Sequence, residues 1–248
     1  MIDFWPYPRW IAHRGAGKLA PENTLAAFRL GASLGYRMFE CDVKLSADGV
    51  PFLLHDATLN RTTNGQGLAS KLNWDELSRL DAGSWHSPPY TGEPLTNLEA
   101  IAHFCLDKAL SVNIEIKPTP GSELLTGTVV ANVAARLWAK APPGLVPLLS
   151  SFQPEALEAA RIAQAHLPRA LLLNTLPPSW LETVMRLGCV AVVGKHTLWD
   201  TVRVQRAQSA GLRVLSYTVN DTSAADRLWA LGTDGIITDR VEVLSPAS

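Results

Sequence analysis

Short apolar runs alternate with longer stretches in which apolar positions recur every three or four residues. The short runs, rich in β-branched residues, are typical of buried strands, and the longer stretches are typical of amphipathic helices. The predicted strands cover residues 10–12, 36–43, 112–116, 146–149, 170–173, 190–193, 212–217 and 235–238. The predicted helices cover residues 24–35, 123–140, 155–164, 179–187, 200–210 and 222–231.

Regular alternation of strands and helices indicates a parallel sheet with helices packed outside it. Eight such units within 248 residues predict a (β/α)8 TIM barrel, as a single catalytic domain over residues 1–248. A doubly wound open sheet is the alternative. Its glycine-rich GxGxxG fingerprint after the first strand is missing, because residues 13–17 read His-Arg-Gly-Ala-Gly.

One segment interrupts the alternation after the second strand. Asp48-Gly49 between two apolar runs predicts a hairpin turn, and the returning strand begins at Pro51 and ends at His55. Polar, glycine-bearing sequence follows, with a short helix near residues 74–79. We therefore predict an insertion over residues 46–95, and long connections of this kind are usually functional.

Composition narrows the class of protein. The chain is 47% hydrophobic and 18% charged with a formal net charge of -1, so no basic field favours nucleic acid or an anionic membrane. Cys41, Cys105 and Cys189 form no CxxC pair, which argues against disulfides and zinc. The first residues lack a signal-peptide pattern, and no apolar run could span a bilayer. We expect a cytoplasmic protein whose partner is a small molecule, with no stable membrane association.

Polar side chains recur at the ends of the first three barrel strands, where such barrels carry their catalytic groups. These residues are His13, Arg14, Glu40, Asp42, Glu115 and Lys117. Alternation along a strand puts Glu40 and Asp42 on one face, and it puts Glu115 on a face opposite Ile114 and Ile116. Carboxylates that share a barrel interior repel one another unless a cation joins them. Oxygen donors favour Mg²⁺ or Ca²⁺ over zinc.

Ordinary structural roles compete with these assignments. A lone strand-end histidine is usually a hydrogen-bonding residue, and Glu40 with Lys117 could form a structural ion pair. We interpret Asp56 as a turn cap, and Trp85 is a candidate substrate contact. His86, His103, His166 and His196 are interpreted as structural or surface residues. The catalytic interpretation gains weight because the polar residues recur at three successive strand ends.

These residues carry a resemblance to the glycerophosphodiester phosphodiesterase family. The matching segments are His13-Arg14-Gly15, Ala20-Pro21-Glu22-Asn23-Thr24, Glu40-Cys41-Asp42-Val43, Asp48-Gly49-Val50-Pro51, His55-Asp56, Arg61-Thr62-Thr63-Asn64-Gly65, Asn113-Ile114-Glu115-Ile116-Lys117 and Asp234-Gly235-Ile236-Ile237-Thr238-Asp239. They span nearly the whole chain, and the run from residue 13 to residue 65 is highly specific. Tyr217 departs from the family, which usually has Trp there, and so does Arg240-Val241, which replaces a common Tyr-Pro.

The resemblance implies a (β/α)8 barrel that hydrolyses glycerophosphodiesters to sn-glycerol 3-phosphate and an alcohol. It implies that His13 and His55 are the general acid/base pair, and we assign the base to His13 and the acid to His55 without a sequence feature that orders them. It further implies phosphate contacts from Arg14 and Lys117. The implied ligands of one divalent cation are Glu40, Asp42 and Glu115. Family members without a secretory signal are often magnesium enzymes, so we expect Mg²⁺ rather than Ca²⁺.

Three other functions remain open. Phospholipase-D-like cleavage of lysophospholipids would need an apolar groove, and no exposed amphipathic segment indicates one. A metal-dependent amidohydrolase would need His-x-His on the first strand, where position 15 is Gly15. A non-catalytic phosphodiester-binding protein would be expected to lose a histidine or a carboxylate, and none is lost.

Overall fold

The computed structural model describes residues 5–246 of the chain. The ends of the predicted domain, residues 1–4 and 247–248, lie outside the described residues, and so does the start of the N-terminal segment for which no signal peptide is expected. Eight parallel strands close into a barrel within the described part, since β1 pairs with both β2 and β9. The barrel strands are β1 (Trp10–Ala12), β2 (Met38–Leu45), β4 (Ser111–Ile116), β5 (Leu148–Ser151), β6 (Arg169–Leu173), β7 (Ala191–Lys195), β8 (Arg213–Tyr217) and β9 (Gly235–Thr238).

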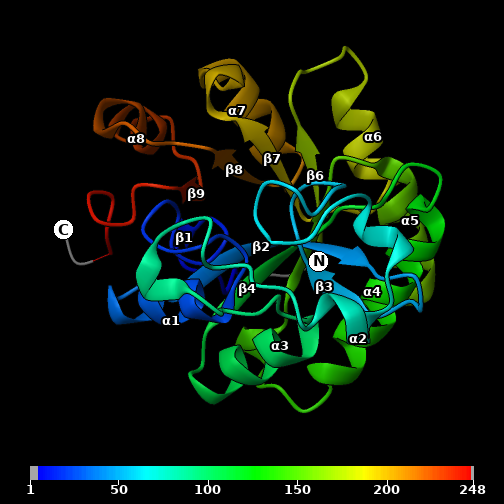
Figure 1. The fold of residues 1–248 in the computed structure, drawn as a ribbon. Coiled ribbons are helices and arrows are strands. Elements are labelled where there is room, and N and C mark those ends of the chain that lie inside the picture. The colour runs from blue at the N-terminus through cyan, green and yellow to red at the C-terminus, as the bar shows by residue number, and fades with distance from the viewer. Residues whose placement is uncertain (1–4, 247–248) are drawn as a thin grey trace.

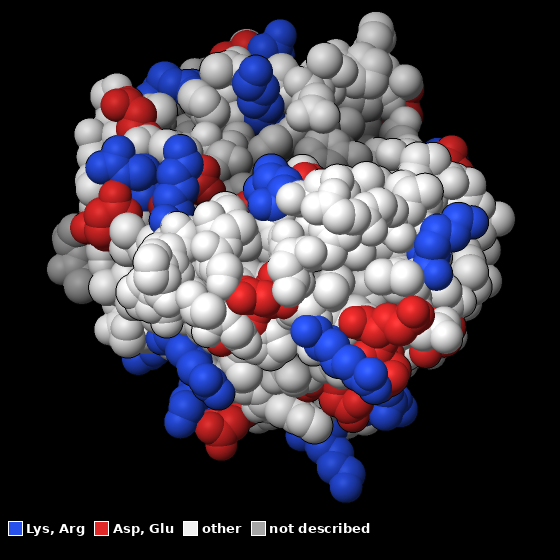
Figure 2. Space-filling view, viewed as in Figure 1, with Lys and Arg blue, Asp and Glu red and all other residues white. Residues whose placement is uncertain are grey.

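Helices surround this barrel, as Figure 1 shows. They are α1 (Leu25–Ser33), α3 (Leu98–Asp107), α4 (Glu123–Leu137), α5 (Pro154–Ala163), α6 (Trp180–Arg186), α7 (Thr201–Ser209) and α8 (Thr222–Ala230). The predicted (β/α)8 TIM barrel is therefore confirmed, and the open-sheet alternative is wrong. None of the described helices is long and apolar enough to cross a membrane. Acidic and basic side chains are interspersed on the face drawn in Figure 2.

The helix α3 was not among the predicted helices. Its N-cap Asn97 accepts a hydrogen bond from the backbone of Ala100, and its buried positions recur at helical spacing. The signal was therefore present in the sequence directly after the polar insertion. With α3 in place, the chain returns to regular alternation before β4.

The segment after β2 folds as a hairpin followed by short turns of helix. The strand β3 (Pro51–Leu53) pairs antiparallel with β2, with Val43 opposite Leu53, so the predicted hairpin at Asp48-Gly49 is confirmed. The helix α2 (Trp74–Leu77) lies where a short helix was expected. Seven buried residues give this segment a small core of its own: Phe52, Leu54, Leu59, Ala69, Leu77, Ala82 and Leu95. The hairpin carries the chain back beside the end of β2, where the backbone of Leu54 bonds to the Asp42 carbonyl at 3.1 Å.

Side chains inside the barrel fall into an apolar and a polar part. The apolar part includes Ile11, Met38, Leu148, Ala170, Leu172, Ala191, Val193, Leu215 and Ile237. Ile114 and Ile116 belong instead to the core between sheet and helices, together with Phe39, Cys41 and Val43. The alternation inferred from the sequence is thus confirmed, and Glu40, Asp42 and Glu115 point to the barrel interior.

Close packing of α4 on α5 depends on Gly127. A Cβ atom at this position would lie 2.2 Å from the carbonyl oxygen of Ala156. Alanine favours a helix interior by about 1 kcal/mol over glycine, but overpacking costs roughly 1–3 kcal/mol. We expect Gly127→Ala to lower the free energy of unfolding in urea titrations, whereas Gly144→Ala, with open space at its Cβ, should not. Greater stability of Gly127→Ala would contradict this packing argument.

Candidate active site

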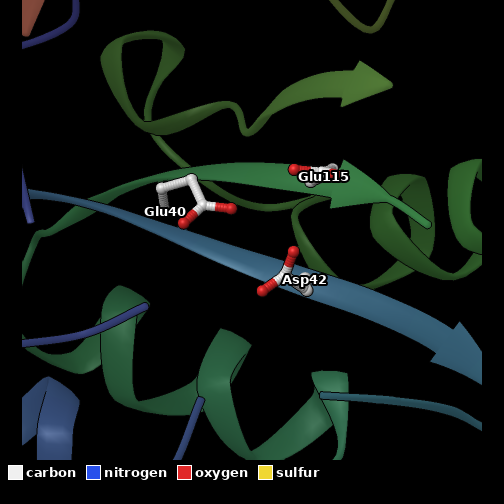
Figure 3. A group of neighbouring side chains, drawn as sticks. All are labelled: Glu40, Asp42 and Glu115. Atoms are coloured by element: carbon white, nitrogen blue, oxygen red, sulfur yellow. The ribbon is translucent and has the colours of Figure 1, made fainter. Parts of the chain in front are cut away.

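Three carboxylates converge at the end of the barrel where the parallel strands finish. β2 and β4 are neighbours in a register that sets Asp42 opposite Glu115. One ligand oxygen from each of Glu40, Asp42 and Glu115 lies within 4.8 Å of the others, and Figure 3 shows the carboxylates directed toward one another. All three residues are buried, and Glu40 is only 3% exposed.

Burial and mutual repulsion strain this carboxylate cluster. Burial and the charge of Asp42 raise the pKa of Glu40 well above its usual range, and the same two causes raise the pKa of Glu115. Burial opposes ionisation of Asp42 too, but Lys117 and Arg14 outweigh it and lower the pKa of Asp42. Glu40 Oε1 is buried and has no hydrogen-bond partner among the described residues. An oxygen-rich, negatively charged cluster with such an atom fits a hard divalent cation.

Cations of the chain lie against one side of the cluster. Lys117 Nζ is 3.1 Å from Asp42 Oδ1 and 2.8 Å from Glu115 Oε1. Burial lowers the pKa of Lys117, yet the two carboxylates outweigh it and raise that pKa to about 12. Arg14 Nε lies 3.2 Å from Asp42 Oδ2. The alternative ion pair between Glu40 and Lys117 is not among the contacts of the described chain.

His13 follows β1 and is held by an aspartate from the far end of the chain. Its Nδ1 lies 2.6 Å from Asp239 Oδ1, and Asn220 donates to the other oxygen of Asp239 at 2.9 Å. The Nε2 atom faces Glu40 Oε2 at 3.7 Å. Burial lowers the pKa of His13, but the bond to Asp239 and the charge of Glu40 outweigh it, so the net pKa is raised. An Nδ1–H donated to Asp239 leaves Nε2 for proton transfer.

His55 has a matching arrangement on the other side of the site. Its Nδ1 lies 2.7 Å from Asp56 Oδ1, and burial lowers the pKa of His55. Arg61 donates to both oxygens of Asp56, at 2.7 and 3.0 Å. The interpretation of Asp56 as a turn cap is therefore wrong, because its carboxylate orients an imidazole and binds a guanidinium.

A chain of charged groups joins the two histidine regions. Arg61 donates two hydrogen bonds to Glu22, at 2.9 and 2.8 Å, and Arg14 donates to the same carboxylate at 2.8 Å. The backbone N–H of Arg14 donates to Glu40 at 3.1 Å. The positions of His55, Arg14 and Glu40 are thus coupled through Arg61 and Glu22. Arg61, Glu22 and Asp239 had no predicted site role, although all three lie in the segments that resemble the family.

We expect Arg61 to act as a positioning residue for His55. Arg61→Ala removes both bonds to Asp56, so the imidazole loses its fixed orientation, and misplacement of this kind costs about 10²-fold in kcat. Arg79→Ala is the matched control, because Arg79 lies in the same inserted segment and its ion pair with Asp75 joins two exposed side chains. Steady-state kinetics check this prediction, and an unchanged kcat with a raised KM would instead assign Arg61 to substrate binding.

Two hollows flank Glu115 and Phe152, which line both. The smaller, about 30 Å³, is also lined by His13, Glu40, Asn113, Leu172, Tyr217 and Ile237. The larger cleft, about 350 Å³, is also lined by Lys44, His55, Asp56, Ala57, Ile116, Lys117, Pro118, Ser151 and Gln153. Tyr217, where the family usually has Trp, therefore forms part of the wall of the smaller hollow. Trp85 lines neither hollow, and its indole donates to Ala82.

Comparison with known proteins agrees with this geometry. The sequence profile described as the Glycerophosphoryl diester phosphodiesterase family matches residues 13–243. The chain is 32% identical over 244 residues to the glycerophosphodiester phosphodiesterase of Caldanaerobacter subterraneus subsp. tengcongensis, covering 94% of this chain and 95% of that protein.

Solved structures show the same likeness. An Oleispira antarctica phosphodiesterase, in complex with the product sn-glycerol 3-phosphate, superposes with a TM-score of 0.87 at 34% identity, covering 94% of this chain and 93% of that one. A glycerophosphodiester phosphodiesterase from Agrobacterium tumefaciens has a TM-score of 0.76 at 27% identity, with 94% and 96% covered.

Proposed function

The chain belongs to the glycerophosphoryl diester phosphodiesterase family and hydrolyses glycerophosphodiesters, and from this premise we propose how it does so. The products are sn-glycerol 3-phosphate and a free alcohol. Glu40, Asp42 and Glu115 would hold a divalent cation, and His13 and His55 transfer the protons. The observation that carries this proposal is the convergence of three buried carboxylates within 4.8 Å, with His13 facing Glu40 and His55 lining the adjoining cleft, and with each imidazole bonded to an aspartate.

The cation that we propose is Mg²⁺, with Ca²⁺ as the alternative, since both take carboxylate oxygens. When bound, it would neutralise the three carboxylates and polarise a phosphate oxygen. Arg14, held by Glu22 beside the cluster, offers a planar donor group for the phosphate, and Lys117 adds a compact charge. Together these groups offset the negative charge that a phosphodiester brings to an already acidic site.

Proton transfer follows from the two histidine positions. His13 faces Glu40, and we assign it to take the proton from the attacking hydroxyl, whether of water or of the substrate's own glycerol. Where the glycerol hydroxyl attacks, the alcohol leaves and a cyclic glycerophosphate forms, and water then opens this ring to give sn-glycerol 3-phosphate. His55 lines the larger cleft, so it gives a proton to the alcohol oxygen as the phosphorus–oxygen bond to that alcohol breaks. Asp239 and Asp56 fix the two rings through Nδ1 and stabilise the charge that each ring carries in turn.

A substrate panel tests the proposed function. Purified protein is treated with EDTA and then supplied with Mg²⁺, Ca²⁺ or buffer, and release of sn-glycerol 3-phosphate from glycerophosphocholine and glycerophosphoglycerol is followed. We expect no release after EDTA and recovery with the preferred ion. Release that EDTA does not affect would overturn the metal proposal. Hydrolysis of lysophosphatidylcholine in preference to these substrates would favour the phospholipase-D-like alternative.

A further inference from the structure

Lys44 is a buried, positively charged residue at the mouth of the active site. The proposed hydrolysis gives it no role. This lysine follows Asp42 on β2 by two residues, is only 4% exposed, and lines the cleft of about 350 Å³ together with His55 and Lys117. Its ammonium donates to the carbonyl oxygen of Lys117 at 3.2 Å. An ammonium carries three N–H donors, so Lys44 retains hydrogen-bonding capacity toward the cleft.

The other charged residues that line this cleft each have an ion-pair partner, whereas Lys44 has none among the described residues. Lys117 is paired with Asp42 and Glu115. Asp56 is paired with His55 and Arg61. No carboxylate of the described chain lies within ion-pair distance of the Lys44 ammonium, and its neighbour at the end of the adjacent strand β4 is a second cation, Lys117. Lys44 is therefore a cation of the cleft wall that no carboxylate contacts directly.

The cleft is the half of the site that suits the alcohol group. Glu115 and Phe152 line both hollows, so the two are parts of one depression around the carboxylate cluster. The hollow beside His13 and Tyr217, about 30 Å³, has room for about one water molecule. The cleft beside His55 is more than ten times larger and contains the proposed proton donor to the alcohol oxygen. The alcohol group is therefore expected in this cleft, whose wall includes Lys44.

We propose that Lys44 selects the alcohol group, favouring a hydroxyl-bearing alcohol without a cation, such as glycerol or inositol, over choline or ethanolamine. A hydroxyl oxygen accepts the free N–H groups of Lys44, whereas an ammonium group is repelled by it. Quaternary ammonium ligands are normally bound by several aromatic faces. Among the residues that line this cleft, Phe152 is the one aromatic ring besides the His55 imidazole. This inference rests on the proposed hydrolysis and names its substrate class.

The test compares kcat/KM for glycerophosphoinositol and glycerophosphoglycerol with that for glycerophosphocholine, in the wild type and in Lys44→Gln and Lys44→Glu. We expect the wild type to prefer the two polyol substrates. Because Lys44→Gln removes the like charge that a choline group would meet, the preference should fall by about tenfold in this variant. It should reverse in Lys44→Glu, where the new carboxylate attracts the choline group. Lys71→Gln, which changes an exposed lysine in the same inserted segment, should keep the wild-type ratio.

A ratio of kcat/KM values separates selectivity from damage to the fold or to the shared catalytic groups, since such damage lowers both rates together. An unchanged ratio in Lys44→Gln overturns the inference. A wild-type preference for glycerophosphocholine also overturns it, even where no Lys44 variant folds. Absence of hydrolysis of every glycerophosphodiester would instead count against the proposed function itself.

Discussion

Alanine in place of His55 is expected to lower kcat for glycerophosphodiesters of ordinary alcohols by about 10²–10⁴-fold, the usual contribution of a general acid. A p-nitrophenol leaving group needs no proton, so the same variant should hydrolyse glycerophospho-p-nitrophenol at close to the wild-type rate. His55 is expected to act this way because it lines the cleft that receives the alcohol and is oriented by Asp56 at 2.7 Å.

His13→Ala should behave differently, because a base at the nucleophile is needed whatever the leaving group. We expect it to lose activity on both kinds of substrate. His103→Ala, which changes an exposed histidine on α3, should leave both rates unchanged. If His55→Ala were equally impaired with the p-nitrophenyl substrate and His13→Ala were rescued by it, the two roles would have to be exchanged.

The second large effect is expected at the carboxylate cluster. In the wild type, Mg²⁺ at 100 times its Kd should stabilise the fold by about 2.7 kcal/mol through mass action, and EDTA should remove that gain. Glu40→Gln removes one ligand charge, so the metal-induced rise in Tm should largely disappear, and hydrolysis should be lost with it.

In EDTA, we expect Glu40→Gln to have no destabilising effect on the fold. Because burial and the charge of Asp42 oppose ionisation of Glu40, an uncharged amide should make Glu40→Gln at least as stable as the wild type under these conditions. Glu99→Gln, at an exposed position on α3, is the control and should keep the full response to Mg²⁺. If no divalent cation changes the Tm of the wild type, the metal-site proposal is contradicted.

The local pattern of apolar and polar residues determined much of the fold of this protein. The period of the apolar residues determined the barrel, because each strand and helix must bury one face and eight such pairs close on themselves. Alternation along β2 and β4 determined that Glu40, Asp42 and Glu115 share the interior, since side chains two apart point the same way. The helix α3 was not predicted, although a clear helical spacing follows the polar insertion.

The partners of the two histidines were decided by tertiary structure. Asp239 meets His13 across 226 positions of sequence, because closure of the barrel places β9 beside β1. Arg61 reaches both Asp56 and Glu22 only because the hairpin after β2 folds back over the mouth. A single sequence shows which residues can ionise or donate a hydrogen bond. Their pKa values, their partners and the orientation of their side chains depend on burial and on neighbours that only the folded chain brings within a few ångströms.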